Sequence, residues 1–152
     1  MQREQIYFTG REIALAVKLE QALLATIEMI DYLMEHEKTE AYVIMLVSAF
    51  DVDLKGLLLE QKRETDMLFE IDSERSIYAV LCQGTKIDGG YHFAQRLMRH
   101  LKLDQAKEPY CVQLEIRKSG YMVKDVVFRL IDLCLQAKEQ KRVGEIVLQT
   151  IH

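Results

Sequence analysis

The sequence has few residues that would cross-link or interrupt the chain. Of its 152 residues, three are cysteine, one is proline, and the seven glycines are scattered. Cys82, Cys111 and Cys134 are odd in number, widely spaced and set in apolar runs, which argues against a disulfide framework or a zinc site. They are typical of small buried hydrophobes in a reducing compartment. Because no Gly- or Pro-rich linker divides the chain, we predict one domain over residues 1–152.

Long apolar runs and an excess of basic residues are also missing. No segment has the ~20 apolar residues that a membrane span requires, and no signal-peptide pattern opens the chain, so we predict a cytoplasmic protein. The 20 Lys and Arg against 24 Asp and Glu leave a net charge of −4. This argues against binding a nucleic-acid polymer. It does not exclude a small anionic ligand, which two or three arginines can hold. The four histidines show no metal-ligand spacing.

Hydrophobic periodicity and turn residues predict an α-β-α-β-β-α-β-α order with a final short strand. The helices are expected at Arg11–His36, Asp53–Lys62 with Asp53 as its cap, Ile87–Leu103 and Val123–Lys141. The strands are expected at Ala41–Ala49, Met67–Ile71, Ser76–Leu81, Tyr110–Ile116 and Ile146–Leu148. In the helix at 87–103 we expect Tyr91 to face inward and His92, Arg96 and Arg99 to face another side.

The charged tip Asp72–Arg75 separates two strands by too few residues for a helix, so these strands form a hairpin. The predicted fold is therefore an α+β sandwich of the ferredoxin or nucleotide-cyclase type, with a central, mostly antiparallel sheet flanked by helices. The long N-terminal helix, within residues 1–37, carries apolar residues on more than one stripe. We predict that its second side contacts a second copy of the chain or an upstream domain.

Three segments resemble GGDEF domains, the fold of diguanylate cyclases. YAVLCQGTKIDGGYHFAQRLMRHL (78–101) is similar to the family's F-A-V-L-L-P-x-T strand and the A-x-x-x-A-E-R-L helix. FRLIDLCLQAKEQKRVGEIVL (128–148) resembles the C-terminal A-D-x-A-L-Y-x-A-K segment and retains Ala137-Lys138. FTGREIALAVKLEQAL (8–23) resembles the opening L-T-G-L-x-N-R-R-x-F. The resemblance covers most of the chain and depends on the shared order of the motifs.

The departures from the family predict that catalysis is lost. With Tyr78 at the signature Phe, ERSIY (74–78) replaces GGDEF, so both glycines are gone and Ile77 stands where a carboxylate is expected. The first strand has no metal-binding aspartate near Met45–Ser48. The family's guanine-binding helix has no counterpart between that strand and Arg63. We therefore predict no catalytic residue, no metal and no cofactor. The alternative is a rebuilt cyclase or nucleotidase site, in which Asp51 and Asp53 would replace the lost carboxylates.

Arg63 and Asp66 match the family's R-x-x-D inhibitory site, which binds cyclic di-GMP, although their spacing to Tyr78 is about two residues longer than usual. Arginine can pair bidentately with phosphate or a guanine edge. As in PelD-type exopolysaccharide receptors, an arginine from the following helix would add a contact, with Arg99 the first choice and Arg96 the second. The alternative for Arg63 and Asp66 is an exposed pair at the end of a helix. The alternative for Arg99 and Arg96 is a solvated helix face.

The resemblance thus implies a non-catalytic bacterial receptor for cyclic di-GMP. It would signal to a protein partner through helix 11–36, with exopolysaccharide regulation as the expected role. The alternative is a nucleotide-independent pseudo-enzyme scaffold that uses the same helix to dimerise or to bind another protein.

Overall fold

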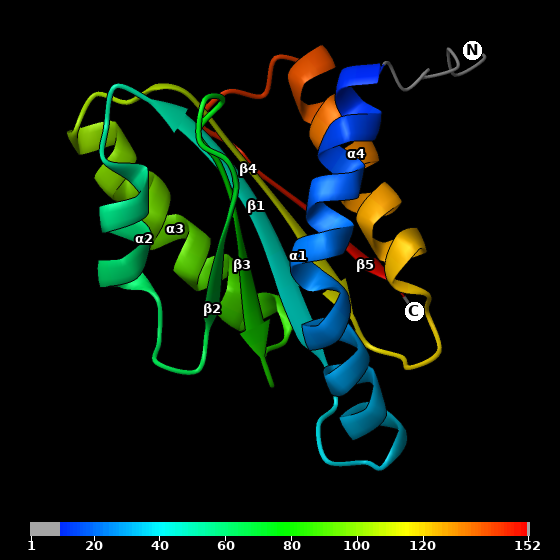
Figure 1. Cartoon of the computed structure of the whole chain (residues 1–152). Coiled ribbons are helices and arrows are strands. Elements are labelled where there is room, and N and C mark those ends of the chain that lie inside the picture. Colours follow the sequence, from blue (N-terminus) through cyan, green and yellow to red (C-terminus); the bar gives the residue numbers. More distant parts are fainter. Residues whose placement is uncertain (1–9, 152) are drawn as a thin grey trace.

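The computed structural model describes residues 10–151. A five-stranded sheet lies between two layers of helices, with α1 and α4 on one face and α2 and α3 on the other (Figure 1). The helices are α1 (Gly10–Glu35), α2 (Leu54–Gln61), α3 (Ile87–Leu103) and α4 (Val123–Glu139). The strands are β1 (Tyr42–Phe50), β2 (Met67–Asp72), β3 (Ile77–Gln83), β4 (Lys107–Ile116) and β5 (Ile146–Ile151). The predicted α+β architecture and element order are confirmed.

The sheet has the order β2-β3-β1-β4-β5. All neighbouring strands are antiparallel except β4 and β5, which are parallel and are connected through α4. A parallel pair needs such a crossover, whereas the β2–β3 hairpin closes with a short turn. The two sheet edges are therefore β2 and β5, at opposite sides of the molecule.

Strand β1 is central and is buried on both faces. Its alternating residues divide between two cores: Tyr42, Ile44 and Leu46 pack towards α1 and α4, while Val43 and Met45 pack towards α2 and α3. Successive side chains of a strand point to opposite faces, so a strand covered on both sides must be apolar throughout. This explains the continuous apolar run in the sequence.

Helix α1 buries one stripe and leaves a second exposed. Leu19, Leu23 and Ile27 are fully buried against the sheet and α4, whereas Val17 and Leu24 are 47% and 41% exposed. Only one of the two predicted sides is thus packed within the described chain. Any contact on the second side would have to come from outside the described residues.

Helix α3 spans the predicted residues, but the prediction that Tyr91 faces inward is wrong. Tyr91 is 37% exposed, and Phe93 is buried in the core instead. The buried positions of α3 centre on Gly90, Ala94, Leu97 and Leu101, and Tyr91 lies at the side of that stripe. The glycine allows a close approach to the sheet, because a Cβ at Gly90 would lie 3.0 Å from Cγ1 of Val43 in β1.

Candidate functional site

The segment between α2 and β2 forms a tight turn that brings Arg63 and Asp66 together. Helix α2 ends at Gln61, and Lys62 is extended. The Arg63 N–H donates to Oδ2 of Asp66 at 2.9 Å, while the Asp66 N–H donates to the Arg63 carbonyl at 3.1 Å. An aspartate that caps a nearby backbone N–H in this way stabilises a turn. The two intervening residues thus put both side chains on one side, as the spacing predicted.

The two side chains form an ion pair in which one partner is buried and the other is exposed. Nη2 of Arg63 lies 2.9 Å from Oδ1 of Asp66, and Nε lies 3.2 Å from the same oxygen. The Asp66 side chain is only 1% exposed, whereas that of Arg63 is 52% exposed. Hydrogen bonding to Asp66 raises the pKa of Arg63 above its usual value. The guanidinium therefore neutralises a buried carboxylate from its solvent side.

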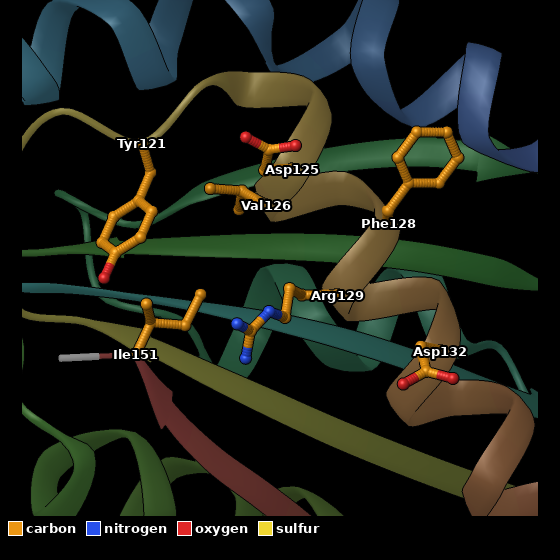
Figure 2. Close-up of a pocket in the computed structure, with 7 residues that line it drawn as sticks. All are labelled: Tyr121, Asp125, Val126, Phe128, Arg129, Asp132 and Ile151. Atoms are coloured by element: carbon orange, nitrogen blue, oxygen red, sulfur yellow. The ribbon is translucent and has the colours of Figure 1, made fainter.

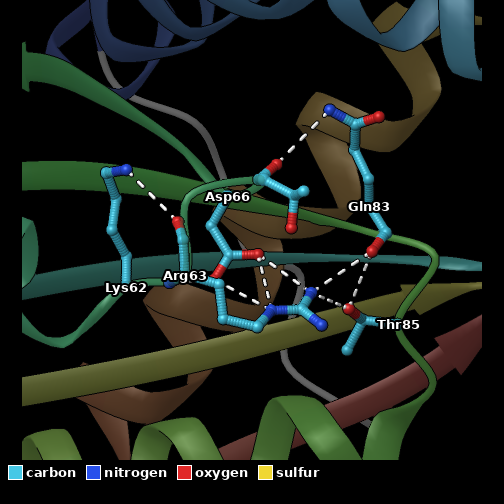
Figure 3. A network of polar contacts seen from close by, with 6 residues as sticks. Lys62, Arg63, Asp66, Gln83 and Thr85 are labelled. Carbon is cyan, nitrogen blue, oxygen red and sulfur yellow. Dashed lines mark hydrogen bonds and ion pairs between the residues drawn. The ribbon is translucent and has the colours of Figure 1, made fainter.

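The end of β3 provides further contacts to Arg63 (Figure 3). Nη2 also donates to the Gln83 carbonyl at 3.2 Å and to the hydroxyl of Thr85. The Thr85 hydroxyl donates in turn to the Gln83 carbonyl at 2.9 Å, and Thr85 is buried. Sequence reasoning missed Thr85. Its signal was the threonine retained after the strand, in the segment AVLCQGT that resembles the family.

One edge of the Arg63 guanidinium remains available. Its Nε and Nη2 are used by Asp66, Gln83 and Thr85, whereas Nη1 makes no hydrogen bond to the described part of the chain. A planar cation with two free N–H donors and an exposed face can bind a phosphate oxygen, accept stacking by a base, or donate to a purine edge. The site is therefore suited to a ligand that carries a phosphate group or a planar base.

Asp66 cannot reach a ligand in this arrangement. Its carboxylate accepts hydrogen bonds from the Arg63 backbone and side chain and is almost wholly buried. The sequence predicted that Asp66 would accept N–H groups from a guanine. In the structure its partner is Arg63, and Asp66 fixes the position of that arginine.

The structure does not join Arg99 or Arg96 to this network. Arg99 lines a groove of about 530 Å³ with Gly144 and Ile146, next to edge strand β5, whereas Arg63 precedes the opposite edge strand β2. A single ligand would have to span the sheet to contact both. Arg96 is exposed and lies over the Phe93 ring, 5.6 Å from its centroid. Phe93 packs in the core that α3 shares with α2, and Arg96 does not line the groove that holds Arg99.

The hairpin tip, Asp72–Arg75, is closed by its own side chains. Asp72 accepts from the Arg75 backbone at 3.1 Å and from Nε at 2.9 Å. These bonds, more than the 3.7 Å approach of Lys18 from α1, lower the pKa of Asp72 to about 2. The Ser48 hydroxyl of β1 donates to the Arg75 carbonyl at 3.1 Å. The side chains of Asp72 and Arg75 are therefore mostly covered.

A bulge in the hairpin lengthens β2 by one residue. Glu70 pairs with Tyr78, but Asp72 pairs with Ile77, so Ile71 is an extra residue on β2. A bulge adds one residue to one strand of an antiparallel pair. The bulge therefore adds one residue to β2 between Asp66 and Tyr78. Ile77 itself is buried in the core facing α1 and α4.

The carboxylates nearest the end of β1 serve other roles. Asp53 caps α2 by accepting from the Gly56 N–H at 3.0 Å, as the sequence predicted. Asp51 forms an exposed ion pair with Lys107 at 3.3 Å. Within residues 10–151 no three His, Cys, Asp or Glu side chains are grouped as metal ligands. The only helix between β1 and β2 is the eight-residue α2.

A separate groove of about 430 Å³ lies along α4 (Figure 2). Arg129 projects from α4 between Asp125 and Asp132, which are four residues before it and three after it, and Ile151 of β5 lines the same groove. Charges of both signs therefore surround it. None of the predicted site residues contributes to this groove, which lies on the α1 and α4 side of the sheet.

No helix in the described part of the chain has the length and apolar character needed to cross a membrane. At the level of sequence, no family model matches the chain, and no curated protein matches it either.

Solved structures show the same fold. The chain is similar to the diguanylate cyclase SiaD of Pseudomonas aeruginosa, solved with its activator SiaC, with a TM-score of 0.67 and 12% identity over 91% of this chain and 66% of that one. The FimX GGDEF domain of the same organism has a TM-score of 0.65 and 14% identity, over 86% of this chain and 93% of that domain. A diguanylate cyclase/phosphodiesterase of Caldicellulosiruptor saccharolyticus has a TM-score of 0.53 and 13% identity, over 84% of this chain and 86% of that one. The protein therefore has the fold of GGDEF domains.

Proposed function

We propose that the protein is a non-catalytic receptor for cyclic di-GMP that signals to a protein partner. The observation that carries this proposal is the exposed edge of Arg63, which Asp66 and Thr85 hold in place. The resemblance of Arg63 and Asp66 to the family's R-x-x-D site supports cyclic di-GMP as the ligand. Exopolysaccharide regulation is the role that the likeness to PelD-type receptors favours.

Cyclic di-GMP has the chemistry that this edge recognises. It carries two phosphodiester charges and two guanine rings, and the free Nη1 donors of Arg63 can pair with either a phosphate or a guanine edge. Because Arg99 lies at the opposite sheet edge, Arg96 is the better second contact for the same molecule. Arg99 would contribute only through a second ligand molecule or by long-range attraction.

The closed hairpin tip supports the non-catalytic part of the proposal. Nucleotide would have to approach the tip where Glu74 and Arg75 replace two glycines, and a side chain obstructs such an approach. Arg75 is tied to Asp72 and to Ser48, and the buried Ile77 occupies a carboxylate position of the signature. A two-metal phosphoryl-transfer site needs carboxylates on the strand and the hairpin together.

Calorimetric titration with cyclic di-GMP tests ligand binding. Wild type should bind, Arg63→Lys should bind much more weakly because an ammonium lacks the planar fork, and Lys62→Gln should bind as wild type does. Arg96→Ala and Arg99→Ala then rank the second contact, with the larger loss expected for Arg96→Ala. Absence of binding heat for wild type at millimolar ligand would refute the receptor function. Equal binding by Arg63→Lys would refute the site.

A second assay tests the absence of catalysis. The protein is incubated with guanosine triphosphate and magnesium, and the nucleotides are separated by chromatography. No cyclic di-GMP and no guanosine diphosphate should accumulate. Product that disappears in an Asp51→Asn/Asp53→Asn variant would instead establish the rebuilt site.

The exposed stripe of α1 favours a second candidate function, a nucleotide-independent scaffold. Ile13, Val17 and Leu24 are all exposed and recur at intervals of four and seven residues, which is the spacing of one helix side. Sedimentation of wild type and Leu24→Asp tests dimerisation through this side. Leu23 is unsuitable for that test because it is fully buried in the core. A monomer in both cases would exclude a homodimer on this stripe.

A further inference from the structure

The exposed stripe of α1 continues into an acidic groove between α1 and the start of α4. The groove has a volume of about 400 Å³. Ile27 and Val123 form its apolar floor and are buried, while Leu24 and Met122 rise at its edges and are 41% and 67% exposed. An exposed apolar groove with polar rims is typical of a protein interaction site.

The rim of this groove carries mostly negative charge. Glu20, Glu28 and Asp31 line it from α1, and Lys124 is the single basic side chain among the lining residues. None of these four side chains forms an ion pair with another residue of the described chain. Asp31 accepts a hydrogen bond from the Gly120 N–H at 2.8 Å, which holds the loop before α4 against α1. That contact fixes one wall of the groove and leaves the glutamates available.

We infer that this groove binds a basic, amphipathic segment of a protein partner. Apolar side chains of the segment would pack on Leu24, Met122 and the floor, while its lysines or arginines would pair with Glu20 and Glu28. An amphipathic helix in a hydrophobic groove is a common recognition mode. Complementary charge sets the register and rejects acidic segments. The inference depends on the partner-binding part of the proposed function and not on cyclic di-GMP.

The full chain can be tested with defined probes. A fluorescent amphipathic peptide with leucine on one side and lysine on the other is titrated with protein, and anisotropy is measured. Its counterpart with glutamate in place of lysine serves as the charge-reversed probe. The lysine peptide should bind, more weakly as salt increases, and the glutamate peptide should not. Chemical-shift changes should concentrate at Leu24, Glu28 and Met122.

Matched variants distinguish the groove from the general acidity of the protein. Glu20→Gln/Glu28→Gln and the control Glu60→Gln/Asp104→Asn change the net charge equally, but the control residues lie on the α2 and α3 side. The groove variant should bind the lysine peptide about tenfold more weakly, with little change for the control. Leu24→Asp should also weaken it.

Three outcomes would overturn the inference. These are no binding by wild type, an equal loss in groove and control variants, or a wild-type dimer that Leu24→Asp dissociates, since the occupant would then be a second copy. Cyclic di-GMP titration of Glu20→Gln/Glu28→Gln separates this inference from the receptor function. Ligand binding should be unchanged there, whatever the peptide does.

Discussion

The guanidinium of Arg63 lies 2.9 Å from the carboxylate of Asp66, and only the arginine is open to solvent. A carboxylate that loses its water must be compensated by hydrogen bonds and opposite charge, and Arg63 provides both. The same residue presents the free edge proposed to bind ligand. Stability and ligand binding are therefore coupled at this pair, and substitutions must be chosen to separate them.

Arg63→Ala should lower the free energy of unfolding by about 1–3 kcal/mol, because it leaves the buried carboxylate of Asp66 without its main donors. Urea unfolding measures this loss. The double variant Arg63→Ala/Asp66→Asn should lose less than the sum of the two single variants, since the orphaned charge is gone. Strict additivity would contradict the coupling.

Thr85→Val should weaken cyclic di-GMP binding by roughly threefold to tenfold, because it removes one hydrogen bond that orients the Arg63 guanidinium. Thr85→Ser keeps the hydroxyl and should restore most of the affinity, which calorimetry can measure. If Ser binds as weakly as Val, the hydroxyl alone does not position Arg63, and the methyl group is needed as well. If both bind as wild type does, Thr85 does not position Arg63.

Asp72 should contribute an acid-sensitive share of the stability. Its hydrogen bonds to Arg75 lower its folded pKa to about 2, below the usual value of 3.8 for an aspartate. The stabilisation is therefore complete above about pH 4 and is lost as the pH falls towards 2. Asp72→Asn should lower the free energy of unfolding at pH 7 by about 1–2 kcal/mol and flatten its decline over that interval. Asp104→Asn, at the exposed end of α3, is the control and should keep the wild-type profile.

Cys82 and Cys111 should resist thiol reagents in the native protein. Burial raises the pKa of each thiol to about 12, with the nearby charge of Asp66 adding to the effect at Cys82, and the thiolate is the reactive form. At pH 8 both should react with a chromogenic disulfide only as the protein unfolds. Cys134 is only half-buried and should react first. Rapid reaction of three thiols in native buffer would contradict the packing.

Local patterns predicted the helices and strands well because adjacent residues decide them. The Asp53 cap, the single period of α3 and the short tip between β2 and β3 all act within a few residues of sequence. The position of Tyr91 was harder, because its exposure depends on how α3 is rotated over β1. In that arrangement Gly90 faces Val43 of β1, a proximity that no local pattern contains.

Part of the candidate site was predicted because its residues are close together in the sequence. Arg63 and Asp66 are three residues apart, so their spacing alone placed them together. Thr85 and Gln83 approach Arg63 only because β2 pairs with β3. Arg99 is far from Arg63 because α3 crosses beneath β4 and β5, and a helical wheel cannot show which sheet edge a residue approaches.

The sequence by itself determined the α+β order and the Arg63–Asp66 turn, since both follow from residue type and short spacing. The tertiary structure alone decided that Asp66 is buried, that Arg75 is tied to Asp72 and Ser48, and that an acidic groove lies beside α4. These features depend on pairings between distant segments. Which carboxylate loses its water, and which remains free to bind, is settled only when the sheet and its two helix layers come together.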